Sequence, residues 1–239
     1  MKILILGHNG LLGNMVYSYY KSLKYEISTT DLRWNDEDFK NFVIESKPDY
    51  IINCIGIIPQ RKPSNDKYHL INYELPVWLD SLNIKIIHPD TDESDDTPYG
   101  LAKRMAREEA IKNTKCIKTS IIGFEKGTSF SFLEWFLHSE GKVNGFTNQF
   151  WNGNTTLEWA KFSEKLILDW DFYDRVSVLA NPECQSKYNI LLIFKEIFKK
   201  DIEIIPVESV LGKNNCLVGS IICTDLTEQI IEMKEFCDK

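Results

Sequence analysis

Tyr99 and Lys103 are the residues whose types and spacing point most directly to chemistry. They stand four positions apart in the segment YGLAK, so a helix would present both side chains on one face. The preceding segment, DTP, offers a helix cap and then a proline suited to the first helical position. An ammonium beside a phenol lowers the pKa of the tyrosine and makes it usable as a proton donor or acceptor. Because this spacing is common, an exposed helix start with an ordinary lysine is the alternative interpretation.

The first thirteen residues, MKILILGHNGLLG, are the second segment that suggests chemistry. They predict a short strand over residues 2–6, a turn containing Gly7, Gly10 and Gly13, and a helix beginning in the turn. The first glycine permits a tight turn, the second lets a pyrophosphate approach the backbone, and the third lets the helix pack closely on the strand. The helix N-terminus then offers free N–H groups and a positive dipole end to phosphates. Asp31, at the end of the next predicted strand, stands where an acid would hold a ribose hydroxyl. The segment predicts dinucleotide binding rather than a plain strand–turn–helix unit.

Segments typical of strands and helices alternate through the first half of the chain. Strands are predicted at residues 2–6, 25–29, 50–55, 84–88 and 115–122, and helices at residues 12–22, 36–46, 69–82 and 99–113. This alternation predicts an α/β fold with a Rossmann-type doubly wound parallel sheet and a cofactor crevice at the carboxyl ends of its strands. Residues 1–123 are expected to form the nucleotide-binding core. Residues 124–239 are expected to form a small substrate lobe, with elements near 155–180 returning to the core.

The second half begins with an aromatic, glycine-rich and asparagine-rich segment, residues 123–156, which predicts irregular structure. Regular patterns then resume. They predict helices at residues 157–170 and 187–200 and from Asp225 onward, and strands at residues 175–180 and 202–208.

Composition and charge exclude several classes of partner. The formal net charge is −7 without a compensating basic block, which argues against nucleic-acid binding and against an anionic membrane surface. The N-terminal apolar run is too short for a signal peptide, and no run reaches the length of a membrane span, so a cytoplasmic protein is expected. The six cysteines are scattered without a CxxC pair or a histidine at metal-ligand spacing, which predicts reduced thiols and no metal site. These are Cys54, Cys116, Cys184, Cys216, Cys223 and Cys237.

Two motifs resemble those of the extended short-chain dehydrogenase/reductases: GHNGLLG is similar to the GxxGxxG cofactor loop, and YGLAK to the catalytic YxxxK. Four further segments, NCIGIIP, INYELP, KTSIIG and LEWFL…GKVNGFTNQFWNG, resemble the branch of dTDP-4-dehydrorhamnose reductases and related 4-keto-6-deoxy sugar-nucleotide reductases. The segment KIIHPDTD places Thr91 at the family's catalytic hydroxyl. Two departures stand out. Only DESDDTP separates Thr91 from Tyr99, where the family has a longer loop that helps to close the site. The arginine and serine expected in the C-terminal substrate loop are not evident in VLGKNNCLVG.

This resemblance implies an NAD(P)H-dependent reductase of a UDP- or dTDP-linked 4-keto-6-deoxy hexose, of the rhamnose or N-acetyl-rhamnosamine type, in sugar-nucleotide biosynthesis for surface polysaccharides. Tyr99 would protonate the developing alkoxide, Lys103 would lower the pKa of Tyr99 and hold the nicotinamide ribose, and Thr91 would bind the carbonyl oxygen. NADP(H) is favoured over NAD(H), because the reaction would be a biosynthetic reduction and Arg33 could accommodate a 2′-phosphate. The resemblance also allows a homodimer.

The candidate binding residues follow from the same motifs and strand ends. The cofactor candidates are Gly7, Asn9, Gly10, Leu11, Leu12, Gly13, Asp31, Arg33, Asn53, Cys54, Ile55, Gly56 and Asn72. The substrate candidates are Trp135, Phe146, Asn148 and Trp151, although aromatic residues in such numbers are also ordinary core.

Two other functions use the same fold. An NAD-dependent epimerase or dehydratase is one, and a dehydratase would need the acid pair that Asp92 and Glu93 formally supply. A non-catalytic nucleotide-binding partner subunit is the other, and the short loop before Tyr99 motivates it. The acidic residues of that loop are interpreted as a solvated helix start rather than as a metal site.

Overall fold

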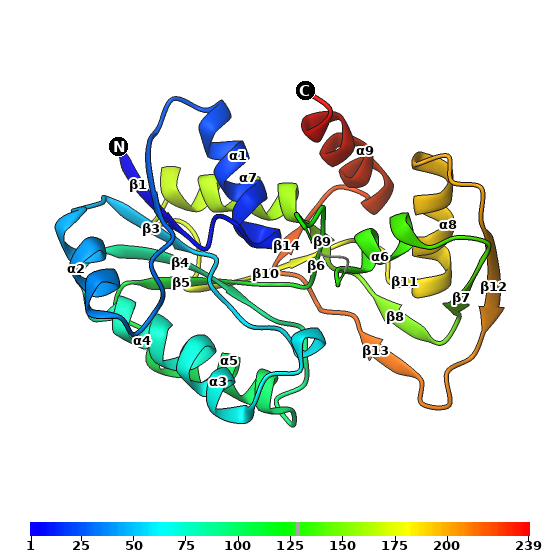
Figure 1. Ribbon diagram of the computed structural model, residues 1–239, viewed down its shortest axis with the longest axis horizontal. Helices are drawn as coiled ribbons and strands as arrows, with labels where there is room; N and C mark the ends of the chain where they lie inside the picture. The colour runs from blue at the N-terminus through cyan, green and yellow to red at the C-terminus, as the bar shows by residue number, and fades with distance from the viewer. Residues whose placement is uncertain (128–129) are drawn as a thin grey trace.

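Seven parallel strands form the central sheet of the computed structural model, which describes residues 1–127 and 130–239 (Figure 1). Their order across the sheet is β14-β10-β5-β4-β3-β1-β2. The strands are β1 (Lys2–Leu6), β2 (Glu26–Thr30), β3 (Tyr50–Asn53), β4 (Lys85–Asp90), β5 (Thr114–Lys118), β10 (Val176–Ala180) and β14 (Ile221–Ile222). Because β2 and β3 lie on opposite sides of β1, the winding of the sheet reverses there and opens a crevice at the carboxyl ends. The predicted Rossmann-type α/β fold is confirmed.

Alternate residues of β1 enter two separate hydrophobic clusters, so both faces of the sheet are covered. Ile3 and Ile5 pack with residues of α1 (Leu11–Ser22) and α7 (Thr156–Leu168). Leu4 and Leu6 pack with residues of α2 (Glu37–Glu45) and α4 (Leu75–Asp80). Figure 1 shows α1 and α7 together on one side of the sheet, with α3 (Asn65–His69), α4 and α5 (Pro98–Glu109) on the other. Burial on both faces explains why β1 and the neighbouring β3 are largely apolar.

Most predicted elements shift by one to three residues at their ends, and three differ more substantially. The helix expected at residues 69–82 begins earlier, at Asn65, and consists of α3, a π-helical turn η2 (Leu70–Glu74) and α4. The helix expected to reach residue 113 ends at Glu109, because the buried Asp80 carboxylate accepts hydrogen bonds from the backbone N–H groups of Lys112 and Asn113. The strand expected at residues 115–122 is divided into β5 and a short β6 (Ile121–Ile122), which pairs with β9 (Asn154–Thr155) in a separate sheet.

The aromatic segment after residue 123 is more regular than predicted. It contains α6 (Phe132–His138), β7 (Lys142–Phe146) and β8 (Gln149–Trp151), and two of its residues, Thr128 and Ser129, lie outside the described residues. Two small sheets form there: β7 pairs with β12 (Glu203–Val207), while β8 lies between β11 (Gln185–Ser186) and β13 (Lys213–Asn215). The aromatic side chains of this segment pack on α8 (Lys187–Ile197). The segment's own sequence does not predict this regular structure, because the packing depends on a helix that lies further along the chain.

Cys184 and Cys216 form a disulfide, so the prediction that every cysteine is a free thiol is wrong. The two residues are 32 positions apart, but β11 and β13 flank the same strand, β8. This pairing brings the segments before β11 and after β13 together, with a Cα–Cα distance of 5.9 Å. Cys54, Cys116, Cys223 and Cys237 are free.

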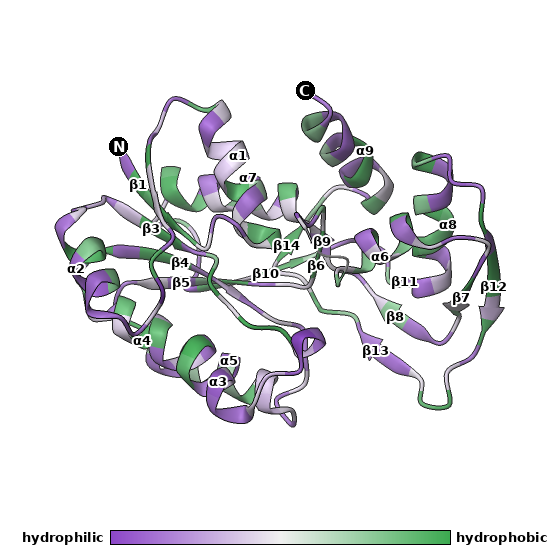
Figure 2. Cartoon of the chain, in the orientation of Figure 1, coloured by the Kyte–Doolittle hydropathy of each residue, from purple (hydrophilic) through white to green (hydrophobic). Residues whose placement is uncertain are grey.

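Helices α8 and α9 (Leu226–Cys237) carry both hydrophobic and hydrophilic residues, as expected for helices with one buried face (Figure 2). Within residues 1–127 and 130–239, no helix combines the length and the apolar character that crossing a membrane requires. The α3–η2–α4 segment, residues 65–80, also carries polar and charged residues along its length.

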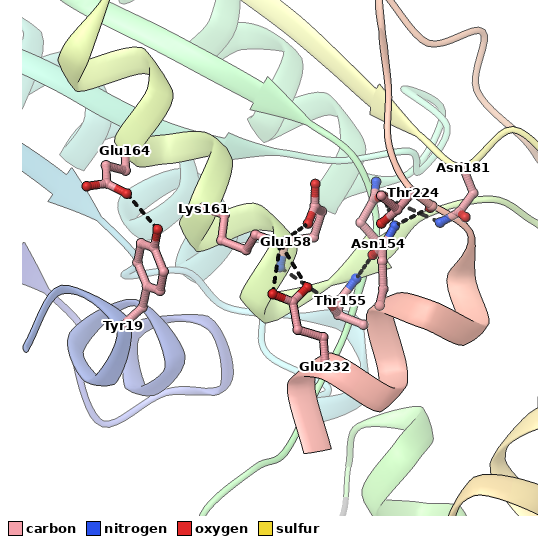
Figure 3. A network of polar contacts seen from close by, with 10 residues as sticks. Tyr19, Asn154, Thr155, Glu158, Lys161, Glu164, Asn181, Thr224 and Glu232 are labelled. Carbon is pink, nitrogen blue, oxygen red and sulfur yellow. Dashed lines mark hydrogen bonds and ion pairs between the residues drawn. The ribbon is translucent and has the colours of Figure 1, made fainter. Parts of the chain in front are cut away.

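Helix α9 is joined to the core through Gln229, which is almost fully buried. Its side-chain oxygen accepts a hydrogen bond from the Thr155 backbone N–H at 2.9 Å, and its amide nitrogen donates to the Asn154 side chain and to the Thr224 carbonyl. On the exposed side of this network, Lys161 of α7 pairs with Glu232 of α9 (Figure 3). The C-terminal helix is therefore fixed to β9 by buried amide hydrogen bonds.

Gln229→Ala should lower the free energy of unfolding by roughly 2–4 kcal/mol, because it leaves the buried N–H of Thr155 without an acceptor and opens a cavity. Lys234→Ala is the matched control on the same helix, since it removes only an exposed pair with Asp238 and should cost less than about 1 kcal/mol. Urea unfolding of both variants measures the difference. Equal losses would show that Gln229 does not anchor α9.

Candidate active site

A cavity of about 1140 Å³ lies at the predicted crevice, between the carboxyl ends of the central strands and the second half of the chain. Its lining comes from the turn after β1, the ends of β2, β3 and β4, the start of α5, and α6, β8, α8 and β13. Many of the predicted site residues contribute to it: Gly7, Asn9, Gly10, Leu11, Leu12, Asp31, Arg33, Cys54, Ile55, Gly56, Thr91, Tyr99, Lys103, Trp135 and Trp151. The structure therefore brings the glycine loop and the tyrosine–lysine motif to one cavity.

The glycine loop is packed too tightly for side chains at two of its positions. Gly7 has a φ of 77°, in the left-handed region that favours glycine, and a Cβ there would lie 2.9 Å from the Cys54 backbone. A Cβ on Gly13 would collide with the carbonyl oxygen of Gly7, so the residue lies behind the loop rather than in the cavity wall. This packing draws the start of α1 against β1 and leaves the helix N-terminus at the cavity. These residues fit the pyrophosphate of a dinucleotide.

The Asp31 carboxylate lies beside the same loop. It accepts a hydrogen bond from the side chain of Asn9 at 2.7 Å, and His8 Nε2 is 3.7 Å away. Arg33, two residues further on, is exposed and also lines the cavity. An acid and a guanidinium are both available where the ribose of a bound dinucleotide would be recognised.

Asn53 and Asn72 are fully buried and do not line the cavity. Both side-chain groups of Asn72 bind the backbone of Ile57, at 2.9 Å each. Asn53 accepts a hydrogen bond from the Ile55 N–H and donates to the ring of His88. The two asparagines hold the loop after β3 in place from behind, and the π-helical turn η2 sets the position of Asn72.

Thr91 and Tyr99 face each other across the short loop that follows β4. Burial raises the pKa of Tyr99 to about 12, a hydrogen bond with the Thr91 side chain lowers it, and the nearby carboxylates of the loop raise it further. The sequence-based expectation was a lowered pKa. It is not met in this structure, because burial outweighs every other contribution. A phenol in this environment stays protonated at neutral pH.

Lys103 lies one helical turn from Tyr99 and is almost fully buried. Its Nζ donates to the Pro89 carbonyl oxygen at 2.9 Å and lies 3.5 Å from Nε2 of His88. Burial lowers the pKa of Lys103 to about 8, opposed by the negative charge of Asp90. Asp90, the last residue of β4, is itself paired with Arg107, which lies on α5 like Lys103. The amine is therefore close to losing its proton at neutral pH.

The loop from Thr91 to Tyr99 is short because it turns directly into α5. Thr97 caps the helix, accepting a hydrogen bond from the Gly100 N–H while its hydroxyl donates to the Ser94 carbonyl. The acidic residues of the loop have partners elsewhere in the chain: Glu93 forms an ion pair with Lys213, and Asp92 accepts a hydrogen bond from Asn215. Strand β13 thus covers the loop.

The second half contributes cavity residues that sequence analysis missed. Lys187, at the N-terminus of α8, and Lys213, on β13, both line the cavity, and burial together with Lys213 lowers the pKa of Lys187. Lys213 is paired with Glu93, whereas Lys187 offers the cavity a positive charge that suits a diphosphate. Lys213 is the basic residue of the segment VLGKNNCLVG, in which the family resemblance leads one to expect an arginine. Of the predicted substrate residues, Phe146 and Asn148 do not line the cavity, and Asn148 instead binds the backbone of Ser209.

No protein-family model matches the chain, and no curated protein matches it. Solved structures do. The dTDP-4-dehydrorhamnose reductase of Clostridium acetobutylicum is similar with a TM-score of 0.76 and 19% identity over 100% of both chains. That of Bacillus anthracis, in complex with NADP, has a TM-score of 0.82 and 15% identity over 99% of this chain and 98% of that one. The chain has the fold of the dTDP-4-dehydrorhamnose reductases. A UDP-glucose 4-epimerase of Thermotoga maritima, with UDP-glucose, shares the fold at a TM-score of 0.74 and 13% identity over 100% of this chain and 99% of that one.

The buried Lys103 should make stability rise with pH between about 8 and 10.5, because in this interval the unfolded chain binds a proton that the folded chain does not. The difference in unfolding free energy between the wild type and Lys103→Met should increase by roughly 2–3 kcal/mol across the interval. Denaturant unfolding at several pH values measures it, with the exposed Lys67→Met as control. A difference that does not change with pH would show that Lys103 titrates as an ordinary lysine.

Proposed function

We propose that the protein is an NAD(P)H-dependent reductase of a nucleotide-linked 4-keto-6-deoxy hexose. The observation that carries this proposal is the position of Thr91, Tyr99 and Lys103 in the same cavity as the glycine loop. The cofactor loop and the acid–base residues must share one cleft for a carbonyl to be reduced. Such an enzyme would supply sugar nucleotides for polysaccharide synthesis in the cytoplasm.

The loop Gly7–Gly10 and the N-terminus of α1 would hold the pyrophosphate of the cofactor, and Asp31 with Arg33 would face its adenosine ribose. When bound, the nicotinamide supplies the hydride for carbonyl reduction. We favour NADP(H), because Arg33 is free to approach a 2′-phosphate whereas Asn9 already holds the Asp31 carboxylate. The NADP complex of the Bacillus anthracis reductase supports this choice.

Thr91 and Tyr99 would bind the carbonyl oxygen of the substrate, and Tyr99 would donate its phenolic proton to that oxygen as it becomes a hydroxyl. The raised pKa of Tyr99 suits this direction of reaction, because the proton must be present on the phenol before the reduction. An enzyme that removes a proton from a sugar hydroxyl would instead need a phenolate. Lys103, buried beside the loop after β3, would bind the nicotinamide ribose.

The remaining cavity wall fits a sugar nucleotide. Trp135 and Trp151 supply aromatic surface for the base and the sugar, and Lys187 supplies positive charge for the diphosphate, whereas Lys213 is held in its ion pair with Glu93. The UDP-glucose complex of the Thermotoga maritima epimerase supports a nucleotide-linked substrate for this fold.

A sugar-nucleotide dehydratase is the second candidate, and the environment of Asp92 favours it. Burial raises the pKa of Asp92, as a general acid for loss of a hydroxyl would require, and Glu93 is adjacent. Against this function, Glu93 is held in an ion pair with Lys213. We therefore rank the dehydratase below the reductase.

The proposal is tested by following NADPH and NADH absorbance with 4-keto-6-deoxy sugars linked to UDP and to dTDP. Consumption of either cofactor establishes the reductase and ranks the substrates. Conversion of a UDP- or dTDP-linked hexose to the 4-keto-6-deoxy sugar nucleotide with loss of water, and with NAD retained on the protein and not consumed, would establish the dehydratase instead. Cofactor binding without either reaction would identify a partner subunit.

Tyr99→Phe should reduce kcat by roughly 10²- to 10⁴-fold, because it removes the proton donor, while the cofactor dissociation constant stays close to that of the wild type. Tyr68→Phe is the matched control: Tyr68 packs edge-to-face on Tyr99 at 5.9 Å but does not line the cavity, so turnover should be nearly unchanged. Steady-state kinetics and fluorescence titration with the cofactor measure both effects. Normal turnover of Tyr99→Phe would refute the proton-donor role.

Lys187→Met should raise KM for the sugar nucleotide about 10-fold with little change in kcat, because it removes one positive charge facing the diphosphate. Lys195→Met on the same helix does not affect the cavity and serves as control. The same assay with both variants gives KM and kcat. An unchanged KM would place the diphosphate elsewhere.

A further inference from the structure

Three buried side chains from three different elements form a continuous polar chain behind the candidate active site. They are Asn53 at the end of β3, His88 on β4 and Lys103 on α5, with exposed fractions of 0%, 2% and 5%. The Asn53 amide nitrogen lies 3.1 Å from Nδ1 of His88, and Nε2 of the same ring lies 3.5 Å from Nζ of Lys103. Only Lys103 of the three lines the cavity. The proposed reaction gives no role to Asn53 or to His88.

The hydrogen bonds of this chain have a fixed direction that begins at the backbone. The Ile55 N–H donates to the side-chain oxygen of Asn53 at 3.1 Å, so the amide nitrogen of Asn53 must face His88. That nitrogen can only donate, and Nδ1 of His88 must therefore be the acceptor, without a proton. Burial is the main cause that lowers the pKa of His88, so the ring is neutral whether or not Lys103 is charged. A neutral ring with a bare Nδ1 carries its proton on Nε2, which faces Lys103.

We propose that Asn53 and His88 are positioning residues that set the protonation state of Lys103. The inference rests on the proposed function only for the role of Lys103 at the cofactor. If Lys103 were an ammonium, its N–H groups and the Nε2–H of His88 would face each other as two donors without an acceptor, which is unfavourable. An amine can instead accept from Nε2–H while it still donates to the Pro89 carbonyl. The chain therefore favours the neutral amine.

The other groups that face Lys103 are few and do not replace this chain. Asp90 of β4 favours the ammonium, but Arg107 of α5 already neutralises it. The thiols of Cys54, after β3, and Cys116, on β5, are buried, and burial raises their pKa values, so both are uncharged at neutral pH. Tyr99, on the same helix face, is a neutral phenol. Besides burial, which lowers the pKa of Lys103, His88 is thus the polar group that can favour the neutral amine.

The consequence is a lysine that takes up or releases a proton near neutral pH. An ordinary lysine ammonium stays charged there, and it could not accept a hydrogen bond or a proton. Because Lys103 lies between the buried chain and the cavity, binding of a charged group in the cavity would shift its protonation. Asn53 and His88 would thereby link the loop after β3 to the acid–base residues.

The first test needs no variant for its readout. Long-range proton–nitrogen correlation spectra of the uniformly ¹⁵N-labelled protein distinguish protonated from unprotonated ring nitrogens, and the chain has only four histidines. His88→Phe identifies the signals of His88 by their loss. We expect Nε2 protonated and Nδ1 unprotonated from about pH 5.5 to 8, without titration. A proton on Nδ1, or a ring that becomes charged within this range, would overturn the proposal.

The second test measures the protonation of Lys103 itself through its ¹³Cε chemical shift over about pH 6–11, assigned with Lys103→Met. Asn53→Ala leaves the charge of the protein unchanged and frees His88 to turn its acceptor toward Lys103, so the pKa of Lys103 should rise by about one unit. In the His88→Phe background, the same change should have no effect. An equal rise in both backgrounds would mean that water entering the space of Asn53 is responsible, and would refute the role of His88.

These readouts separate the inference from the proposed function, because neither uses a substrate. Circular dichroism of each variant establishes that it is folded, and correlations from the backbone to the ring assign His88 in the wild type if His88→Phe does not fold. If His88 and Lys103 titrate as expected but no reductase turnover is found, the inference about Asn53 and His88 stands and the proposed function fails. Turnover with an Nδ1-protonated His88 would do the reverse.

Discussion

The parallel pairing of β1, β3, β4 and β5 is the constraint on which the rest of the structure depends. Parallel strands end at one edge, so the residues that follow them must lie together whatever their separation in sequence. The turn after β1, the loop after β3 and Thr91 after β4 meet there and form one wall of the cavity. The crossover helix α5 then starts at the same edge and brings Tyr99 and Lys103 to it.

Burial gives this edge its chemical character. Tyr99 and Lys103 are shifted in opposite senses by the same cause, because loss of water disfavours the phenolate of one and the ammonium of the other. Both groups are therefore held toward their neutral forms. A protein that must first supply a proton from a phenol can use such a pair. The buried polar chain of Asn53 and His88 behind Lys103 favours the neutral amine further.

The second half of the chain completes the site by holding the short loop after Thr91. Lys213 and Asn215 of β13 bind Glu93 and Asp92, so a strand of the second half covers the short loop. The disulfide between Cys184 and Cys216 fixes the residue that follows β13. The short loop between Thr91 and Tyr99 is therefore held by contacts with β13.

From the sequence alone, six of the seven strands of the central sheet can be predicted in their order along the chain, because each depends on a local pattern, whereas the two-residue β14 cannot. The apolar strand before Gly7, the spacing of its glycines and the cap and proline before Tyr99 each express their structure within a few residues. Long-range partners decided the rest. The disulfide, the break of the predicted helix at η2 and the burial that reverses the expected pKa of Tyr99 all involve segments far apart in the chain. Lys187 and Lys213 became site residues, and Phe146 and Asn148 did not, only when the small sheets around β8 were assembled, because a side chain's direction depends on its strand's neighbours as well as on its own sequence.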